Sequence, residues 1–155
     1  GFSGTTYGGL SHINGKSVDV IRDDIVDPRS TVSGGNFTTS LQPTSYVESG
    51  IPFSINVVTQ SVETRLPSGV IQGMKKRILE ITPVLYKTQN ITINGRQIPL
   101  NTYPASGVGG VFSYTGVTKT PGFLGYNQEA RITISQDQPV FLTVLSLDYK
   151  VSVGQ

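Results

Sequence analysis

Residues 90–100 read Asn-Ile-Thr-Ile-Asn-Gly-Arg-Gln-Ile-Pro-Leu, and this stretch decides the fold class. Asn94-Gly95 stands between two short arms in which β-branched residues alternate with polar ones. An Asn-Gly pair flanked by alternating apolar residues is the strongest short-range signal of a β-hairpin. We therefore predict a hairpin here, and a second turn of the same kind at Asn14-Gly15.

The segments on either side have the same apolar period of two. Between Arg77 and Thr88, Leu79 and Ile81 alternate with polar residues, which predicts a strand. Pro83 lies inside this strand and favours an edge position or a bulge, because proline donates no hydrogen bond to a neighbour. Ile51 to Arg65 carries apolar residues on both faces, which predicts a bulge or bend near Val57 and Val58.

Two strands, Arg131–Ser135 and Val140–Val153, are predicted to close the chain, and the first half of the second should be covered on both faces. The one helix candidate is Ser68–Lys76, and its Gly69 and Gly73 favour no more than a turn or two.

These patterns predict an all-β fold, a β-sandwich or barrel-like domain of about nine short strands. At most one short helix is expected, between Pro67 and Lys76. Because no linker composition divides the chain, we predict one β-rich domain over residues 1–155, with residues 1–8 as a flexible terminus. The predicted core consists of Val18, Val20, Ile55, Val57, Leu79, Ile81, Ile132, Ile134, Leu145 and Leu147.

The composition is poor in charge and rich in hydroxyl groups. Charged residues make up 14% of the chain against an average of about 25%, while 16 Ser and 17 Thr fill about a fifth of it. The absence of cysteine excludes disulfides and the usual cysteine-rich zinc sites. With 12 basic against 10 acidic residues, the chain lacks the cationic excess that is typical of nucleic-acid-binding proteins.

Few residues offer catalytic chemistry. His12 is the single histidine, and it lies beside an Asn-Gly turn, where a local hydrogen-bonding role is favoured over catalysis. Asp23, Asp24 and Asp27 lack the spacing of a calcium-binding EF-hand loop, so a solvated turn is favoured over a metal site. The glycines at 107, 109 and 110 are followed by no Lys-Ser/Thr pair, so they form no phosphate-binding loop. We expect no enzyme activity, no catalytic residue, no metal and no cofactor.

The segment Lys75-Lys76-Arg77, called the basic segment below, holds a quarter of the positive charge. At the start of a strand its side chains alternate between the two faces, so they form no flat phosphate-binding patch. We interpret Lys75, Lys76 and Arg77 as solvated or as a subunit-interface site. The glycosylation sequons at Asn36 and Asn90 are formal matches only.

Several short motifs occur in a characteristic order along the chain. The first four are Gly9 to Val20 (GLSHINGKSVDV), Tyr46 to Phe53 (YVESGIPF), Gly73 to Ile78 (GMKKRI) and Leu85 to Thr88 (LYKT). Thr115-Gly116, Gly125-Tyr126 and the closing Ile132 to Leu145 (ITISQDQPVFLTVL) follow. In this order they resemble the last region of the tail hub or nozzle proteins of short-tailed bacteriophages, the family that includes tail tubular protein B. The chain departs from that pattern by Glu-Ser before Gly50 and by Phe141 in place of a second proline.

The resemblance implies a structural protein of the virion, located in the phage tail and forming the terminal part of a longer tail protein. Such proteins assemble into a closed ring, of six copies by family analogy, with other tail proteins as neighbours. Genomic DNA passes through the ring without specific binding, and a host surface receptor is a further expected partner.

The alternative interpretation is a receptor- or carbohydrate-binding β-sandwich module of a virion. Seven tyrosines and a hydroxyl-rich surface suit contacts with sugars. Glycan binding by the isolated chain would favour this alternative, whereas ring assembly would favour the tail component.

Overall fold

The fold is known from a computed structural model, which describes residues 3–61, 63, 65–67, 69–70, 73–100, 112–123 and 125–154. Fifteen strands and one short 3-10 turn, η1 (Ser11–Ile13), form the secondary structure of these residues. Seven of the strands are only two residues long, and every pairing is antiparallel. The prediction of an all-β fold with at most one short helix is confirmed.

The described residues fall into two compact units, each with its own core. Unit 1 contains the chain up to Ser54 and the short piece Asp137–Val140, and unit 2 contains nearly all of the remainder. The two units are described separately below. The sequence predicts a single domain, and that the two units unfold together as one domain stays a prediction.

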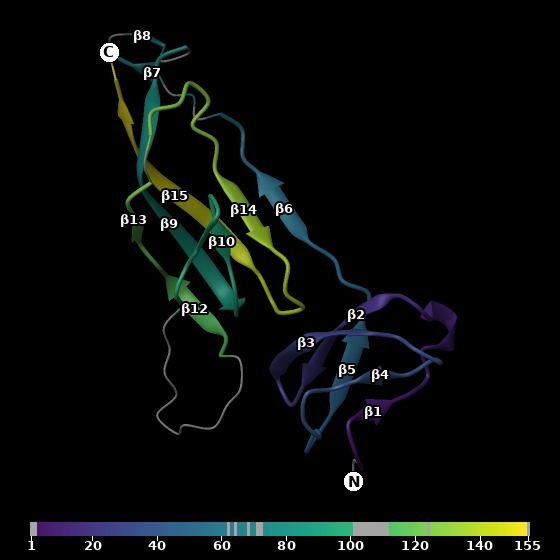
Figure 1. Ribbon diagram of the computed structural model, residues 1–155. Helices are drawn as coiled ribbons and strands as arrows, with labels where there is room; N and C mark the ends of the chain where they lie inside the picture. Colours follow the sequence, from purple (N-terminus) through teal and green to yellow (C-terminus); the bar gives the residue numbers. More distant parts are fainter. Residues whose placement is uncertain are drawn as a thin grey trace. The chain divides into compact units, whose positions relative to one another are not determined.

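Unit 1 is built from two small sheets (Figure 1). A three-stranded sheet has the order β3-β2-β5, and a two-stranded sheet pairs β1 with β4. The hydrophobic core of unit 1 consists of Val18, Val20, Val32 and Phe37. The strands are β1 (Thr6–Tyr7), β2 (Ser17–Arg22), β3 (Ile25–Thr31), β4 (Phe37–Thr38) and β5 (Val47–Gly50).

Part of the terminus that the sequence predicts as flexible, residues 1–8, lies in β1, and the flexibility of this terminus stays a prediction. Thr6 lies opposite Thr38 and Tyr7 opposite Phe37, so this part of the terminus belongs to a sheet. Residues 1 and 2 lie outside the described part of the chain.

Unit 2 holds two larger sheets that share one core. One sheet has the order β11-β10-β14-β6, and in the other β9 pairs with β15 along one edge and with β12 and β13 along the opposite edge. Ile81 and Leu85 from β9 belong to the same buried cluster as Ile93 and Ile134 from the first sheet, as in a β-sandwich. No barrel is closed by the described strands.

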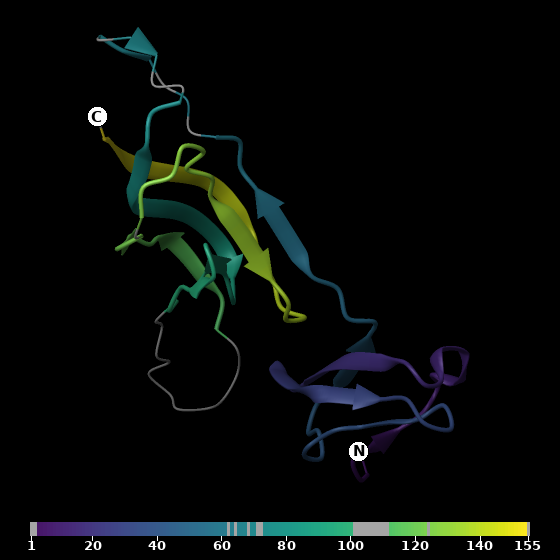
Figure 2. The same ribbon diagram turned by 45° about the horizontal axis from the view of Figure 1, so that its top comes forward.

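The bounds of the unit 2 strands show two long strands, β9 and β15, among short ones. Figure 2 shows the yellow β15 running alongside the teal β9. The strands are β6 (Ile55–Val58), β7 (Arg65–Leu66), β8 (Gly69–Val70), β9 (Lys76–Thr88), β10 (Thr92–Ile93), β11 (Arg96–Gln97), β12 (Tyr114–Val117), β13 (Thr120–Pro121), β14 (Thr133–Gln136) and β15 (Val144–Val153).

The hairpin predicted at Asn94-Gly95 is confirmed. Thr92 lies opposite Gln97 and Ile93 opposite Arg96, and both turn residues have positive φ, 48° and 76°. Positive φ at both central residues is the signature of a type I′ turn, which matches the twist of the flanking strands. The turn at Asn14-Gly15 is of a different kind, because Asn14 has φ −54° and ψ 136° and only Gly15 has positive φ, as in a type II turn.

Two bulges decide which side chains of β9 and β15 are buried. On β9, Leu79 is an extra residue between the pairs Lys150–Glu80 and Val151–Ile78. On β15, Leu145 is an extra residue between the pairs Val144–Leu85 and Ser146–Val84. An extra residue reverses the alternation of faces along a strand, so Leu79 and Leu145 are exposed.

The predicted core is therefore correct in part. Val18, Val20, Ile81, Ile132 and Ile134 are buried, whereas Leu79 and Leu145 are 42% and 64% exposed. Val57 is also exposed, and Ile55 and Leu147 are half-buried. The expectation that the first half of β15 is covered on both faces is wrong for the same reason, and Phe141 just before it is exposed as well.

Of the bulge or bend predicted near Val57 and Val58, the bulge does not form. β6 pairs with β14 in unbroken register from Ile55–Gln136 to Val58–Thr133. Both valines are exposed, which explains how one regular strand carries apolar residues on both faces.

Pro83 occupies a break in the neighbouring strands of β9. β12 ends opposite Val84 and β13 begins opposite Ile81, and the N–H of Thr118 between them donates to the carbonyl of Pro83. Because the N and O atoms of one strand residue point to the same side, the ring nitrogen faces this break, where no strand needs an N–H donor. A central strand thus accommodates a proline without an edge position.

The predicted helix over Ser68–Lys76 is absent from the described residues. Gly69–Val70 form β8, which pairs with Arg65–Leu66, and Lys76 begins β9. Residues 68, 71 and 72 lie outside the described part of the chain.

Candidate interaction surfaces

The basic segment at the start of β9 divides its three side chains between different surroundings. Lys75 is exposed, Lys76 is completely buried, and Arg77 is half-buried. Arg77 lies opposite Ser152 of β15, and its Nε donates to the carbonyl of Phe123 at 3.4 Å. The alternation of faces that the sequence predicted is confirmed here.

Lys76 uses its charge and its backbone within its own chain. Its Nζ lies 3.2 Å from Oε1 of Glu63, and its N–H and carbonyl both bond to the backbone of Asn127 at 2.8 Å. In this conformation the ammonium of Lys76 is closed off from any neighbouring molecule. A subunit-interface role stays a prediction that rests on the accessible side chains of Lys75 and Arg77.

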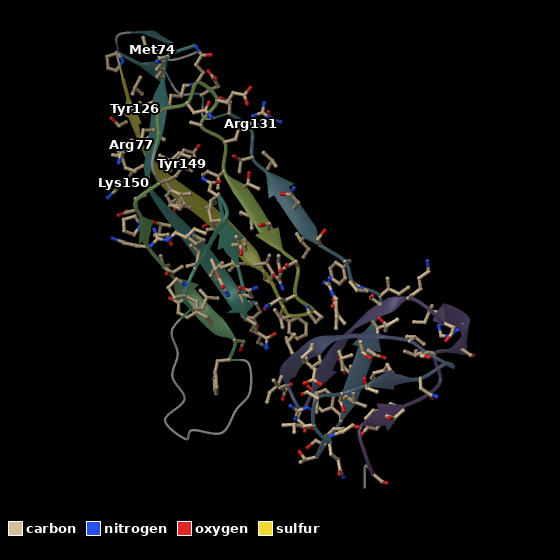
Figure 3. The ribbon with its side chains drawn as sticks, viewed as in Figure 1. Met74, Arg77, Tyr126, Arg131, Tyr149 and Lys150 are labelled. Carbon is tan, nitrogen blue, oxygen red and sulfur yellow. The ribbon has the colours of Figure 1, made fainter. Side chains whose placement is uncertain are left out.

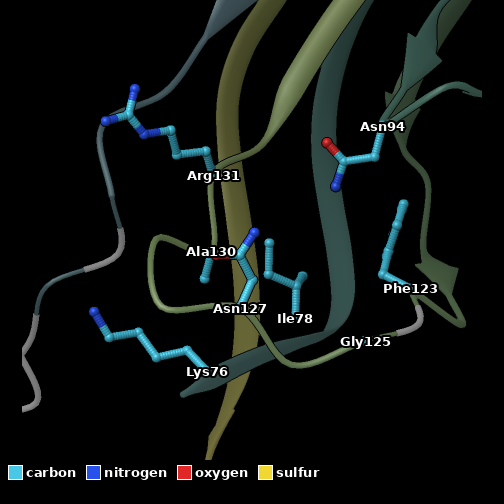
Figure 4. Close-up of a pocket in the computed structure, with 8 residues that line it drawn as sticks. All are labelled: Lys76, Ile78, Asn94, Phe123, Gly125, Asn127, Ala130 and Arg131. Carbon is cyan, nitrogen blue, oxygen red and sulfur yellow. The ribbon is translucent and has the colours of Figure 1, made fainter. Parts of the chain in front are cut away.

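A small pocket of about 140 Å³ lies beside Lys76 (Figure 4). Lys76, Asn127 and Arg131 line one part of it, and Asn94 and Phe123 line another. The volume is well below the roughly 300–1,000 Å³ of a typical ligand site. The pocket is therefore sized for ordered water rather than for a sugar or a cofactor.

Asp23, Asp24 and Asp27, the three aspartates singled out in the sequence, hold loops of unit 1 in place. The Asp23 carboxylate accepts backbone N–H bonds from Thr44, Ser45 and Tyr46 at 2.8, 2.7 and 3.1 Å. These bonds, that of Thr44 foremost, stabilise the charged form and lower the pKa of Asp23 from 3.8 to about 2. The hydroxyl of Tyr46 donates to Asp24, and this bond raises the pKa of Tyr46.

Asp27 is buried, and the backbone N–H and hydroxyl of Ser40 both donate to its carboxylate. The carboxylates of Asp23 and Asp27 therefore bind the chain's own donors. Within the described residues no group of three or more His, Cys, Asp or Glu side chains is arranged to hold a metal ion.

The remaining sequence motifs fall at scattered places. His12 is exposed on η1, in unit 1. Asn90 is buried and accepts a bond from Gln97 at 3.1 Å, so this sequon is closed to a glycan, whereas Asn36 is exposed. The glycines at 107, 109 and 110 lie outside the described residues.

Unit 2 has an exposed apolar surface that was not predicted from the sequence. A hollow of about 400 Å³ is lined by residues of β6, β14 and β15 and by the segment before β15. Its lining is mainly apolar and consists of Ile55, Val57, Thr59, Ile134, Leu142, Val144, Ser146 and Leu147. We call this hollow the apolar groove. The signal in the sequence was the pair Val57-Val58, whose apolar residues on both faces indicate an apolar exposed strand as well as a bulge.

The two strands β6 and β15, which line the apolar groove, are edge strands of their sheets. β6 is the last strand of its sheet, and β15 is paired only with β9, so each has one edge with no partner strand among the described residues. Figure 3 marks Tyr149 and Lys150 on β15, and both are exposed. An unpaired strand edge beside exposed apolar side chains is a ready site for pairing with another chain.

Comparison with known proteins assigns no family to this arrangement. No protein-family model matches the chain, and no curated protein matches it significantly. In the described part of the chain, no helix has the length and apolar character needed to cross a membrane.

Proposed function

We propose that the chain is a structural, non-enzymatic part of a bacteriophage tail, in the hub or nozzle through which DNA leaves the virion. The ordered motifs from Gly9 to Leu145 suggest this family. The observation that carries an assembly role is the exposed apolar surface of unit 2, which includes Val57, Val58 and Leu145 at 52%, 49% and 64% exposure. Large exposed apolar patches mark interaction sites in soluble proteins.

The low charge of the chain supports the same role. Subunit contacts lose stability when charges are buried without partners, and hydroxyl groups cost less to bury once they are hydrogen-bonded. A net charge of +2 also suits a conduit for DNA, because each phosphate contact would add affinity and slow the passage.

Electron microscopy of the full protein that contains this chain tests the proposal. We expect closed rings, of six copies by family analogy. Reversing the charge at Lys75 and Arg77 (K75E with R77E) should block ring formation and leave the circular dichroism spectrum unchanged. The matched control is Lys16→Glu in unit 1, an exposed lysine outside the basic segment, which should leave the rings intact.

If the full protein forms no rings at the concentrations at which such proteins assemble, the tail proposal is contradicted. Intact rings in the K75E/R77E variant would keep the proposal and remove the basic segment from the interface. Specific glycan binding without rings would instead support the receptor- or carbohydrate-binding alternative.

A further inference from the structure

The outer edge of β15 is long, and beyond the bulge at Leu145 it carries neither a proline nor a bulge of its own. β15 spans ten residues, Val144–Val153, and pairs with β9 along one edge only among the described strands. Proline and bulges are common protections against edge-to-edge pairing. From Ser146 to Val153 the strand has no proline, and the register shift at Lys150/Val151 arises from the extra Leu79 on β9.

The two faces of β15 have different chemistry. Lys150 lies opposite Glu80 and pairs with it at 3.3 Å, which places Lys150 on the face that carries Ser146, Asp148 and Ser152. Tyr149 lies opposite the buried Ile81, so it shares the other face with Leu147, Val151 and Val153. One face is polar and carries one charge of each sign, and the other is apolar.

The sequence of β15 is complementary to itself when read in opposite directions from Tyr149. In an antiparallel pair of two copies centred on this residue, Asp148 faces Lys150 of the other copy, and the same contact occurs again across the axis. Leu147 faces Val151, and Ser146 faces Ser152. Opposite charges and matched apolar residues in facing positions are the contacts that stabilise antiparallel strands.

We infer that the outer edge of β15 binds the same edge of a second copy of this chain, around a two-fold axis at Tyr149. The charge pattern selects this occupant, because Asp148 and Lys150 of each copy face Lys150 and Asp148 of the other. The contact is isologous, since both copies use the same patch. Backbone hydrogen bonds between the strands supply affinity, and the side chains fix the register.

The apolar groove adds area beside the paired strands. A stable interface needs about 800 Å² from each partner. The edge of a ten-residue strand, roughly 33 Å long, supplies part of this area, and the apolar groove adds to it. Val144, Ser146 and Leu147 line the groove and belong to β15 itself. In the proposed pair Ser146 and Leu147 face Ser152 and Val151 in the last part of the partner strand, which would lie beside the groove and extend the contact.

This inference goes beyond the proposed tail role and can fail independently of it. A cyclic ring uses two different patches on each subunit, whereas the β15 pair uses one patch twice. Rings without a two-fold contact would overturn the β15 pairing and leave the tail proposal standing. A two-fold dimer without rings would overturn the tail proposal and leave the β15 pairing standing.

Charge variants of β15 provide the first test, by analytical ultracentrifugation of the chain over a dilution series. The unmodified chain should form a dimer of twice 16.6 kDa. Asp148→Lys places lysine opposite lysine in both charge pairs, and Lys150→Asp places aspartate opposite aspartate. Each variant alone should dimerise about tenfold more weakly.

An equal mixture of the two variants should recover association. Each D148K chain then presents two lysines to the two aspartates of a K150D chain, so both charge pairs become attractive. Circular dichroism of each variant checks that the exposed substitutions leave the fold unchanged. A monomeric unmodified chain overturns the inference, as does a dimer that neither variant weakens.

Cysteine crosslinking tests the register. In an antiparallel pair only the residue on the two-fold axis faces its own counterpart, and the chain has no natural cysteine. Tyr149→Cys should therefore form an intermolecular disulfide when copper-phenanthroline and oxygen remove two electrons and two protons from the two thiols. The matched control Ser146→Cys faces Ser152 and should remain largely uncrosslinked. Equal crosslinking of both variants overturns the proposed register.

Discussion

The ammonium of Lys76 lies 3.2 Å from the carboxylate of Glu63, and the two groups differ sharply in exposure. The side chain of Lys76 is 0% exposed, and that of Glu63 is 45% exposed. Removing the carboxylate leaves a buried charge without its partner, whereas removing the ammonium leaves a carboxylate that water still reaches. The two halves of this ion pair should therefore contribute unequally to stability.

We predict that Glu63→Gln lowers the free energy of unfolding by about 1–3 kcal/mol. Lys76→Met keeps the length of the buried side chain and should change the free energy by less than about 1 kcal/mol. Urea unfolding followed by circular dichroism measures both. A larger loss for Lys76→Met than for Glu63→Gln would contradict the burial of the ammonium.

The bulge at Leu79 predicts opposite results for two neighbouring residues of similar size. Ile81→Ala empties a fully buried site and should cost about 2–5 kcal/mol. Leu79→Ala removes a side chain that is 42% exposed and should cost less than about 1 kcal/mol. Chemical unfolding of both variants decides it, and similar losses at the two positions would mean that β9 has no bulge there.

Asp23 should make the stability of unit 1 depend on pH in the acid range. The pKa of Asp23 is about 2 in the folded chain, whereas the ordinary value for an aspartate, as in the unfolded chain, is 3.8. The folded state therefore binds this proton less readily, so the stabilisation is present above pH 3.8 and is lost as pH falls toward 2. Asp23→Asn removes the charge and should remove this part of the pH dependence.

Thermal unfolding of the two proteins between pH 5 and pH 2 measures the effect of Asp23. The difference in unfolding midpoint temperature between the unmodified chain and Asp23→Asn should become smaller as the pH falls. Glu48→Gln, at an exposed position of β5 in unit 1, is the control and should run parallel to the unmodified chain. A constant difference for Asp23→Asn would show that the Asp23 charge plays no part.

The type I′ turn makes Gly95 sensitive to side chains. Gly95 has φ 76°, a region that most residues enter at a cost of roughly 1–2 kcal/mol. Gly95→Val should lower the unfolding free energy by about that amount, and Gly95→Asn should lower it less, because asparagine tolerates this region. Equal losses for valine and asparagine would place the cause outside the backbone.

Local signals predicted the parts of the fold that depend on neighbouring residues. The Asn94-Gly95 hairpin follows from the turn chemistry of two residues, and the burial of Val18, Val20 and Ile132 follows from the simple alternation of faces. Leu79 and Leu145 were misplaced because a bulge depends on how a strand pairs with its partner. The sequence of one strand does not show where that extra residue lies.

The interaction surfaces were harder to predict for a similar reason. The buried ammonium of Lys76 has its partner in Glu63, thirteen residues earlier, which it meets only in the folded chain. The three N–H donors of Asp23 come from residues 21 to 23 positions later. The free edge of β15 is visible only once its pairing with β9 leaves the other side without a strand.

The extra residue at Leu79 also determines which kinds of mutation β9 tolerates. Before Leu79 the buried side chains are at even positions, Lys76 and Ile78, and after it they are at odd positions, Ile81 and Leu85. Both sets point into the same core because the extra residue shifts the alternation of faces by one. Replacing Leu79 keeps that offset, but deleting it would turn either Lys76 and Ile78 or the rest of β9 outward. Among natural variants of this chain, substitutions should therefore accumulate at Leu79, while changes in length should be excluded there.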